Sequence, residues 1–582
     1  MITVYVNGKA TSVANNTKVL HACTKAGYPV PHLCYHEDLP SFGNCGVCMV
    51  EINGKALRAC STPCEDGMQI KTTGKKLLDL RREALEIILS NHPNNCPECV
   101  KNGRCELQDL SQELAIRHMN LKKVRRKYKG RDESSPSITL DPSYCINCGR
   151  CTYVCNEIQD VHALQSSERG FNTYVGPTFD RPLEESECVK CGQCSSYCPV
   201  AAIYEVDDSD PLWAALDDPD MVLVAQEAPA VRVALGEEFG YKPGTNVVGK
   251  MYTALREIGF DYVFDTNFGA DLTIMEEASE FVDIFLNNPE RFPLITTCCP
   301  SWVDYLEKFN PNMIPLFSSA KSPHQMVGTM VKTYWAEKMK IDPSKIFLVS
   351  VMPCTAKKYE IERMEDMFAS GRKDVDLTIT TRELARMLKT RGIDLAKLPD
   401  GEADNPLGEY TGAGTIFGAT GGVMEAALRT AYFLATGNEL PDPKIDFVRG
   451  GRGIKRGKLE ILGKEIRIGV ASGLGNVNTI MEEIRKAQEQ GKEPPYHFVE
   501  VMACRGGCVG GGGQPYRSTN KVRLARARGL YREDEGMERR ESHNNPSIQK
   551  LYKDYLGKPN SERAHKLLHT SYIARPIKIV HD

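Results

Sequence analysis

Apolar runs alternate with amphipathic stretches between residues 221 and 540 of this chain. Six runs rich in β-branched and aromatic residues predict buried strands, and the segments between them resemble helices. The six runs are residues 221–226, 262–265, 292–297, 346–352, 466–471 and 496–502. Alternation of this kind is typical of an α/β domain.

The first 78 residues follow a different pattern and predict a small β-rich domain. Residues 2–6 alternate between apolar and polar positions before an Asn-Gly turn, and residues 49–53 alternate again before a second Asn-Gly. Between these two stretches, residues 19–26 suit a short helix. Together with the α/β domain, this makes the predicted fold multidomain, combining α/β and α+β parts.

Other boundaries follow from changes in composition. Residues 79–125 are helical in pattern, and an acidic stretch from Glu205 to Asp220 predicts a linker. A polar, helix-forming tail begins at residue 541 and runs to 582. The Gly-Leu-Gly sequence after Ser472 lacks the third glycine of a dinucleotide loop, so it predicts a tight turn between strand and helix.

The overall composition excludes several classes of function. The chain has 582 residues, enough for several domains, with 41% hydrophobic and 26% charged residues. A net charge of −3 gives no electrostatic case for nucleic-acid binding. No apolar run approaches the ~20 residues of a membrane span, and the N-terminus starts with a strand-like segment rather than a secretion signal. We therefore expect a cytoplasmic protein.

Cysteine changes this ordinary picture. The chain contains 22 cysteines, of which 17 lie within the first 200 residues, many of them spaced by two. Disulfide frameworks belong to small secreted chains that lack a large core. In a long chain without a secretion signal, closely spaced cysteines indicate metal sites instead.

Three of the predicted strands in the α/β domain lead directly into cysteines. The segments read TCCPSW from Thr297, MPCTAKK from Met352 and EVMACRGGCVGGGG from Glu500. Loops that follow neighbouring parallel strands converge on the crevice where open α/β sheets bind ligands. Four thiolates from three such loops suit a cubane iron–sulfur cluster. The glycines after Cys508 indicate backbone packed against a bulky group that is not protein.

Two cysteine runs in residues 140–208 form an internal repeat. Both have the spacing C-x2-C-x2-C-x3-C, which is the arrangement of two-cluster bacterial ferredoxins, where the fourth cysteine of each run serves the other cluster. Two unrelated zinc sites would not need this matched spacing. The predicted ligand sets are Cys145, Cys148, Cys151 and Cys198 for one 4Fe-4S cluster, and Cys155, Cys188, Cys191 and Cys194 for the other.

The three segments in the α/β domain resemble the active-site signatures of the iron-only (FeFe) hydrogenases, and the resemblance extends over nearly the whole chain. It implies a large α/β catalytic domain over residues 221–540, preceded by ferredoxin-like iron–sulfur domains. It also implies an H-cluster, in which a 4Fe-4S cubane is joined to a di-iron subcluster carrying CO and cyanide. The implied cubane ligands are Cys299, Cys354, Cys504 and Cys508, and the implied reaction is reversible proton reduction to H2.

The same resemblance, shared with the large iron–sulfur subunit of respiratory NADH dehydrogenases, accounts for the first 125 residues. Residues 1–78 resemble a 2Fe-2S ferredoxin-like domain with the ligands Cys34, Cys45, Cys48 and Cys60, although the first gap is longer than in plant-type ferredoxins. Residues 79–125 resemble a 4Fe-4S domain with one histidine and three cysteine ligands, His92, Cys96, Cys99 and Cys105. Cys23 then reads as a core residue and Cys64 as a structural spare.

The resemblance also implies roles around the di-iron subcluster. Cys298 would be a free thiol that passes protons, Glu277 and Glu280 would carry them further with Ser318 as the link, and Lys357 would hold a cyanide ligand by a charge-assisted hydrogen bond. The implied pocket lining is Pro229, Ala230, Met352, Phe417 and Met502. The family usually has serine where Ala230 stands, so one hydrogen-bond donor to cyanide is missing here.

Electrons would reach the active site through four accessory clusters, one 2Fe-2S and three 4Fe-4S. The chain shows no flavin or nicotinamide site, so the resemblance to catalytic subunits of NAD(P)-linked, including electron-bifurcating, hydrogenases implies an FMN-containing NAD(P)-binding subunit and a small 2Fe-2S subunit. Ferredoxin and maturation proteins are further implied partners, and the tail from 541 resembles a hydrogenase small subunit. The alternatives are a stand-alone ferredoxin-dependent hydrogenase, an electron-relay subunit or a hydrogen sensor.

A basic strip near residue 125 has two alternative interpretations. Residues 117–131 contain eight Lys or Arg and no acid. We read the strip as a solvated linker, with a docking site for an acidic electron donor as the alternative.

Overall fold

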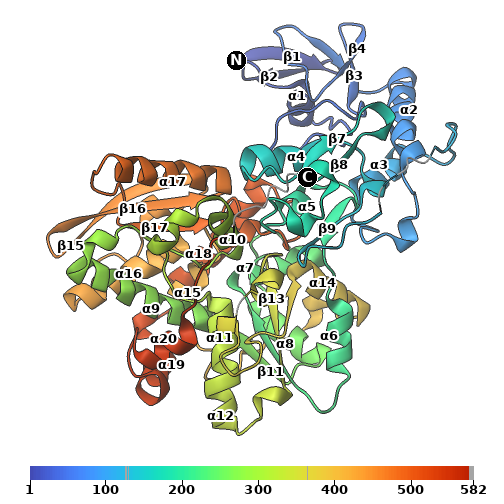
Figure 1. The fold of residues 1–582 in the computed structure, drawn as a ribbon. Helices are drawn as coiled ribbons and strands as arrows, with labels where there is room; N and C mark the ends of the chain where they lie inside the picture. The colour runs from blue at the N-terminus through green and yellow to red at the C-terminus, as the bar shows by residue number, and fades with distance from the viewer. Residues whose placement is uncertain (125–127, 129, 364, 576–582) are drawn as a thin grey trace.

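The computed structural model describes residues 1–124, 128, 130–363 and 365–575. Figure 1 shows the N-terminal iron–sulfur region above a larger domain that contains two separate sheets. Each candidate site lies at the ends of strands or short helices of these modules.

The N-terminal domain is a five-stranded sheet with the order β2-β1-β5-β3-β4. Strand β1 pairs antiparallel with the edge strand β2 and parallel with the central strand β5. The bounds are β1 Ile2–Val6, β2 Lys9–Val13, β3 Met49–Ile52, β4 Lys55–Arg58 and β5 Gln69–Lys71, with helix α1 at Val19–Ala26. The predicted helix and alternating strands are confirmed, because apolar positions such as Val4 and Val6 face a buried core.

Two helices follow, as the helical pattern predicted. They are α2 at Lys75–Asn91 and α3 at Glu106–Glu113. The repeat region beyond them contains helices α4 at Arg150–Tyr153 and α5 at Gln193–Tyr197, and an antiparallel strand pair of β6 at Ile138–Leu140 and β9 at Ile203–Glu205. A hairpin of β7 at Gln165–Ser167 and β8 at Tyr174–Gly176 lies between the two halves.

The large domain contains two four-stranded sheets that lie side by side in Figure 1. The first has the order β11-β10-β13-β14 and is parallel throughout, with Glu227 opposite Val351. Its strands are β10 Val222–Glu227, β11 Tyr262–Asp265, β13 Ile346–Met352 and β14 Leu377–Thr380. The second has the order β12-β17-β16-β15, with strands β12 Leu294–Ile295, β15 Ile454–Ile461, β16 Lys464–Ser472 and β17 Phe498–Met502.

The sequence pattern misjudged three of these strands. Strand β12 has two residues instead of the expected six, and Pro293 before it has no N–H to offer a ladder. Strands β14 and β15 were not expected. Strand β15 forms an antiparallel edge of its sheet and is largely solvent-facing, so its charged residues hid the strand pattern.

Long helices surround the sheets and place the chemistry. They are α8 Val248–Ile258, α9 Thr266–Asn287, α11 Pro323–Met330, α14 Thr381–Thr390, α16 Gly422–Thr436 and α17 Leu474–Glu489. Helix α9 packs against both α11 and α16, and 16 of its 22 residues are buried. The predicted turn between strand and helix after Ser472 is present, since α17 starts two residues later.

The acidic stretch from 205 to 220, which was predicted to be a linker, is folded against the large domain. It contains helix α6 at Ser209–Leu216, whose Leu212 is fully buried in the core of the large domain. Glu205 is also buried and forms ion pairs with Arg382 and Arg386. Buried charges of this kind are tolerated only when they are paired. The stretch therefore fixes the iron–sulfur region to the large domain.

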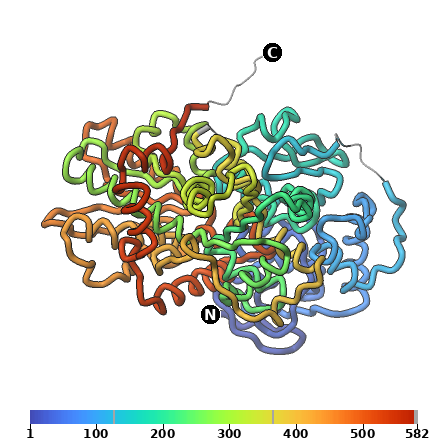
Figure 2. Tube along the Cα trace, turned by 90° about the horizontal axis from the view of Figure 1, so that it is seen from below, coloured from blue at the N-terminus to red at the C-terminus, as the bar shows by residue number. Residues whose placement is uncertain are grey.

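The chain ends in a segment that runs along the large domain, drawn in red in Figure 2. It contains α18 at Asn520–Gly536, α19 at Pro546–Leu551 and α20 at Glu562–Leu568. Although the tail was expected to be polar, Ile548, Leu556 and Leu568 are buried against the domain.

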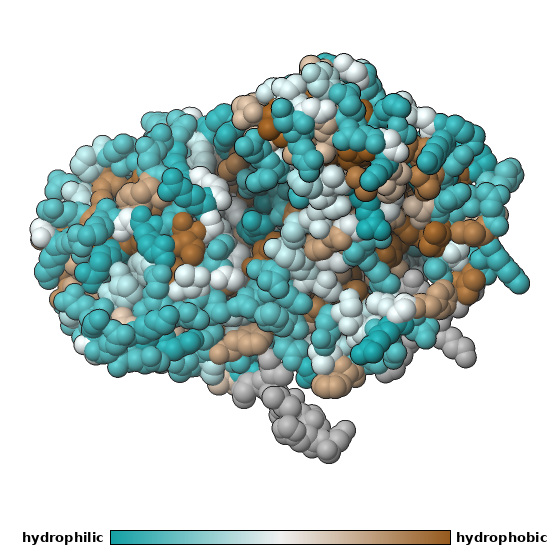
Figure 3. Space-filling model, turned by 90° about the horizontal axis from the view of Figure 1, so that it is seen from above, coloured by the Kyte–Doolittle hydropathy of each residue, from teal (hydrophilic) through white to brown (hydrophobic). Residues whose placement is uncertain are grey.

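The face of the molecule drawn in Figure 3 is mainly hydrophilic, with apolar residues in scattered groups. No described helix is both long enough and apolar enough to cross a membrane.

Candidate active site and cluster sites

A cavity of about 80 Å³ lies where the loops after β12, β13 and β17 meet. This is several times the ~10–15 Å³ that a single water requires. The four cysteines expected to hold a cubane line it together, as does every residue predicted for the pocket. These residues are Cys299, Cys354, Cys504 and Cys508 with Cys298, Lys357, Pro229, Ala230, Met352, Phe417 and Met502.

The four thiols suit a bound iron group, because several thiolates buried together are unfavourable without a cation. Burial raises the pKa of all four, and neighbouring thiolates raise the pKa of Cys354, Cys504 and Cys508 further, to about 12 for Cys508. Four thiolates in one buried cavity would therefore be unfavourable by themselves. Bound iron would remove that cost, because a metal deprotonates the thiols that coordinate it.

The glycine run after Cys508 allows protein backbones to approach one another closely. A Cβ on Gly511 would lie 2.2 Å from the carbonyl oxygen of Pro353, and one on Gly512 would lie 2.6 Å from that of Cys191. The glycines therefore permit close contact between protein backbones, while Gly511 also lines the cavity and the predicted contact with a non-protein group stays a prediction. Through Gly512 the cavity loop touches the second ferredoxin-like run directly.

Further contacts join that run to the cavity. The side-chain amide of Gln193 donates to Cys504 Sγ at 3.2 Å and to the carbonyl oxygen of Gly510 at 2.9 Å. The amide of Gln159 donates to the carbonyl oxygen of Ala503 at 2.9 Å. One ferredoxin-like site is thus in direct contact with a cysteine of the cavity.

Two smaller cavities lie inside the repeat region, and each is lined by a crossed set of cysteines. One is lined by Cys145, Cys148, Cys151 and Cys198, and the other by Cys155, Cys188, Cys191 and Cys194. The structure therefore brings together the same sets that the spacing predicted. Among the described residues no three His, Cys, Asp or Glu side chains are arranged to hold a single metal ion, whereas these thiols surround a space.

The four cysteines of the N-terminal domain also meet. The thiols of Cys45 and Cys60 act as hydrogen-bond partners that lower the pKa of Cys34 strongly, and Cys60 does the same for Cys48. Cys23 and Cys64 are buried in the same domain core that contains Cys48 and Cys60. Burial, with a smaller effect of Cys64, raises the pKa of Cys23 to about 12, as expected for an inert thiol.

One ring nitrogen of His92 is buried and free to coordinate a metal. Its Nδ1 contacts the side-chain oxygen of Asn94 at 3.0 Å, while its buried Nε2 has no partner. Cys96 raises the pKa of Cys99 after the larger effect of burial, which places these two thiols close together, and burial raises the pKa of Cys105 to about 11. An unpartnered, buried imidazole nitrogen suits the ligand role predicted for His92, and the meeting of His92 with the three thiols stays a prediction.

The two N-terminal sites both adjoin the first ferredoxin-like site. Near the His92 site, the Lys101 ammonium donates to the carbonyl oxygen of Cys198 at 2.5 Å. Near the 2Fe-2S site, Arg150 donates to the carbonyl oxygen of Cys34 at 3.4 Å, and the Asn44 amide donates to that of Cys148 at 3.3 Å. The sites therefore form a branched series that leads to the large cavity.

Helix α9 carries the two predicted acids one turn apart. Glu277 is fully buried, and neither of its carboxyl oxygens has a hydrogen-bond partner. Burial, and then the charge of Glu280, raise its pKa to about 8, while the nearby Ser318 offsets part of the rise. Ser318 also acts on Glu280, whose Oε1 pairs with the half-exposed Arg291 at 3.2 Å. Burial and the charge of Glu277 also raise the pKa of Cys298, which lines the cavity. Cys298, Glu277, Glu280 and Arg291 therefore form a series from the cavity toward the surface.

Lys357 is held by acceptors that the sequence analysis missed. Its ammonium donates to Glu360 Oε2 at 2.7 Å, to Ser322 Oγ at 2.9 Å and to the carbonyl oxygen of Cys298 at 3.3 Å. His324, which also lines the cavity, contacts Glu360 Oε2 through Nδ1 at 2.8 Å. Although burial opposes ionisation, Lys357 and His324 lower the pKa of Glu360 to about 2. The three-residue spacing of Lys357 and Glu360 on helix α13 (Lys357–Glu360) was the available signal.

The basic strip is only partly described, since its residues 125–127 and 129 lie outside the described ranges. Its start packs near the end of α2, where Lys123 donates to the carbonyl oxygen of Pro93 at 2.8 Å and the backbone of Val124 donates to that of Ser90 at 3.0 Å. The docking role stays a prediction.

Comparison with known proteins gives five family matches along the chain. The longest is to "Iron only hydrogenase large subunit, C-terminal domain" over residues 221–512, followed by "Iron hydrogenase small subunit" over 520–575. The N-terminal matches are "2Fe-2S iron-sulfur cluster binding domain" over 1–75, "NADH-ubiquinone oxidoreductase-G iron-sulfur binding region" over 81–120 and "4Fe-4S binding domain" over 182–204.

Similar proteins cover the whole chain. The NADP-reducing hydrogenase subunit HndD of Solidesulfovibrio fructosivorans is 46% identical, covering 99% of both chains. Iron hydrogenase 1 of Clostridium pasteurianum is 41% identical, covering 98% of this chain and 100% of its own. Among solved structures, an apo variant of the [FeFe]-hydrogenase HydA1 from Chlamydomonas reinhardtii is 42% identical with a TM-score of 0.56, covering 63% of this chain and 99% of that one.

Proposed function

This chain belongs to the iron-only (FeFe) hydrogenase family, and from that premise we propose that it interconverts H2 with protons and electrons as the catalytic subunit of a multimeric, NAD(P)-linked complex. As a hydrogenase with 2Fe-2S and 4Fe-4S domains ahead of its catalytic domain, the chain is an oxidoreductase. The observation that carries the proposal is the cavity in which four cysteines from three separate loops meet Cys298 and Lys357.

We assign the cubane of the H-cluster to Cys299, Cys354, Cys504 and Cys508. The accessory clusters take the three ligand sets that the structure brings together and the His92 set. This assignment uses 15 accessory cysteines with His92 and leaves Cys23, Cys64 and Cys298 unligated. The domain boundaries proposed from the sequence, 1–78, 79–125, 140–208, 221–540 and 541–582, accompany this assignment, with the small-subunit match starting earlier, at 520.

The chain's own residues would deliver protons and orient the site. When bound, the di-iron subcluster supplies the metal that binds hydrogen. Cys298 gives or takes a proton at the cavity, Glu277 exchanges it with Glu280 through Ser318, and Arg291 marks the exit to solvent. Glu277 suits this task because a pKa of about 8 keeps it protonated yet able to release a proton near neutral pH. Lys357, held charged by Glu360, would anchor a cyanide ligand.

Electrons would enter at one of the two outer sites and pass through the first ferredoxin-like cluster to the second. Contacts between successive sites support this order, ending with Gln193 beside Cys504. The His92 cluster should have a higher potential than an all-thiolate cluster, because imidazole carries no negative charge.

The proposed electron partner follows from the relatives of the chain. The relative named as an NADP-reducing hydrogenase subunit supports a complex with an FMN-containing NAD(P)-binding subunit and a small 2Fe-2S subunit, with ferredoxin as a second carrier if electrons are bifurcated. The full-length likeness to Iron hydrogenase 1 supports a stand-alone enzyme as the second candidate. A cytoplasmic location stays a prediction.

Two measurements test the proposal. Infrared spectra of matured protein should show CO and cyanide stretches together with H2 production, and their joint absence would refute the hydrogenase assignment. Purification from the native host should recover FMN-bearing subunits with the chain. Recovery of an active chain without them would favour the stand-alone alternative.

A further inference from the structure

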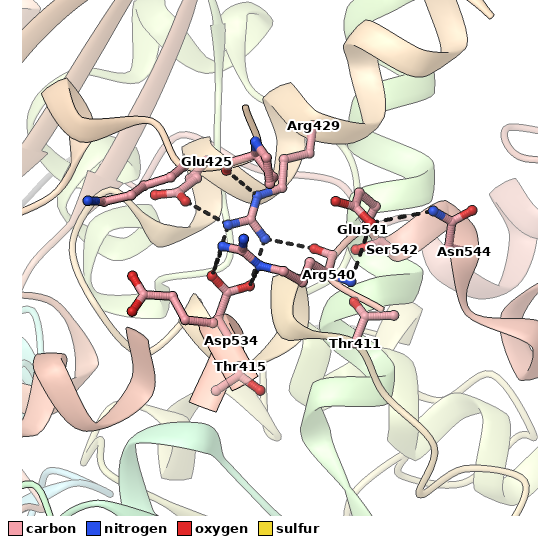
Figure 4. A network of polar contacts seen from close by, with 12 residues as sticks. Thr411, Thr415, Glu425, Arg429, Asp534, Arg540, Glu541, Ser542 and Asn544 are labelled. Carbon is pink, nitrogen blue, oxygen red and sulfur yellow. Dashed lines mark hydrogen bonds and ion pairs between the residues drawn. The ribbon is translucent and has the colours of Figure 1, made fainter. Parts of the chain in front are cut away.

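The C-terminal segment, residues 520–575, is fastened to the catalytic domain by buried ion pairs. Asp534 on α18 accepts hydrogen bonds from Arg429 of α16 at 2.8 and 3.0 Å, and from Arg540 at 2.7 and 3.2 Å (Figure 4). Arg429 also donates to Glu425 at 2.6 Å, and both Asp534 and Glu425 are fully buried. Such a paired cluster fixes the segment in one position.

The far end of the segment pairs with the loop that carries Ser318. The backbone N–H of Lys321 donates to the carbonyl oxygen of Leu568 at 2.8 Å, and the N–H of Thr570 donates to that of Ser319 at 2.8 Å. These bonds surround an antiparallel bridge between Ala320 and His569. The loop therefore gains a strand-like neighbour from a part of the chain 250 residues away.

Ser318 itself is held from two sides. Its carbonyl oxygen accepts from the Thr297 hydroxyl at 3.1 Å and from the Tyr572 hydroxyl at 2.9 Å. Thr297 directly precedes Cys298 in the chain. Burial raises the pKa of Tyr572 well above its usual value, so this hydroxyl keeps its proton and remains a donor.

His569 links the same loop to α9. Its Nδ1 contacts the Ser319 hydroxyl at 2.8 Å, and its Nε2 contacts Glu276 Oε2 at 3.1 Å. Glu276 precedes Glu277 on α9 and also accepts from the backbone of Asn560 at 2.8 Å and from the Tyr552 hydroxyl. The segment thus contacts both sides of the gap that separates Ser318 from the acids of α9.

We propose that Tyr572 and His569 are positioning residues of the proton route, holding the Ser318 loop beside α9 so that the Ser318 hydroxyl can link Glu277 to Glu280 during transfer. In each transfer the Ser318 hydroxyl accepts a proton from one carboxyl group and gives its own proton to the other carboxylate. One proton moves and the serine ends unchanged. This inference rests on the proposed hydrogenase function and its proton route, and it gives the small-subunit-like segment a part in turnover.

The test uses the matured full-length enzyme with the substitution Tyr572→Phe, which removes one hydroxyl and keeps the ring. Losing one hydrogen bond to a group whose position limits transfer should lower the rate of H2 evolution about fivefold. The solvent deuterium isotope effect should rise, because proton transfer becomes more rate-limiting. The CO and cyanide bands should keep their frequencies and intensities.

Tyr555→Phe is the matched control, since Tyr555 belongs to the same segment but packs its ring on Tyr334 and Arg563. His569→Gln is the second variant, which weakens the link between Ser319 and Glu276 and should lower the rate in the same way. If both variants keep the control's rate and isotope effect, the inference is wrong. It is equally wrong if the rate falls only in proportion to lost infrared intensity, which would mean a structural role.

Glu277→Gln in the same assay separates this inference from the function on which it rests. A large loss with Glu277→Gln and none with the segment variants would overturn the role of the segment alone. Full activity with Glu277→Gln would overturn the proton route and the inference together.

Discussion

Glu277→Gln should make the protein more stable and the enzyme less active. In the folded protein the pKa of Glu277 is raised from 4.5 to about 8, chiefly because burial disfavours its carboxylate. At 1.36 kcal/mol per pKa unit, the rise from 4.5 to about 8 corresponds to roughly 5 kcal/mol of folding stability. Below pH 4.5 the group is protonated whether the chain is folded or not. Above that pH the unfolded chain ionises first, so the folded state loses stability until the pH passes about 8.

Glutamine has the shape of the protonated acid and never ionises, so it avoids this loss. At pH 7, 2.5 units above the ordinary value, the variant should be about 3 kcal/mol more stable than the parent, with the gap closing toward pH 4.5. Turnover should fall by about 10²–10⁴-fold, the usual contribution of an acid–base group. Thermal unfolding of the matured enzyme across this pH range, with H2 evolution measured in parallel, checks both effects. Glu290→Gln is the exposed control. Parallel unfolding curves for Glu277→Gln and the parent at every pH would refute the burial argument.

Three further substitutions test other parts of the structure. Ala230→Ser restores a donor beside the cavity and should raise the midpoint potential of the di-iron site by about 40 mV in an infrared-monitored titration, equivalent to ~1 kcal/mol; an unchanged midpoint contradicts this. His92→Cys adds a negative charge to its cluster and should lower that cluster's potential by on the order of 100 mV in a titration followed by electron paramagnetic resonance, and a rise would exclude His92 as a ligand. Gly512→Ala places a Cβ 2.6 Å from the Cys191 carbonyl oxygen and should destabilise the protein by about 1–3 kcal/mol in thermal unfolding. The control Gly536→Ala, whose Cβ would have nothing within 4 Å, should leave the stability unchanged. Equal unfolding midpoints for the two variants would contradict the packing argument.

Local sequence patterns predicted the elements that have a strong period and a buried face. Residues 19–26, 262–265 and 346–352 form the expected helix and strands with the expected bounds. The pattern failed where tertiary contacts decide the structure. Strand β15 is held mainly by its hairpin partner β16. The stretch that contains α6 is fixed through Leu212 and through ion pairs of Glu205 that only the folded chain brings together.

Some residues of the candidate site could likewise be predicted from the sequence, and others could not. Cysteine spacing was enough to predict the two crossed sets of the repeat region, because those donors lie in short motifs, whereas the other ligand sets came from the family resemblance. The resemblance supplied Cys298, Glu277, Ser318 and Lys357, and the structure places all four in or next to one cavity, with their roles still to be tested. Glu360 and the tail residue Tyr572 could not be foreseen, since a buried carboxylate and a distant tyrosine acquire meaning only from their contacts.

The proton and electron routes reach the cavity through different modules. In the proposed function, protons would arrive along α9 and the Ser318 loop, which contacts the C-terminal segment, whereas electrons would arrive through Gln193 and the loop that contains Cys504. The Gln193–Cys504 contact is buried, and the Tyr572–Ser318 contact is partly buried. Electron transfer tolerates small displacements because a tunnelling rate falls smoothly with distance. A hydrogen-bonded proton relay does not, because a hydrogen bond weakens steeply beyond its normal geometry. The C-terminal segment therefore supports the route that needs the more exact geometry, and its buried ion pairs hold it there.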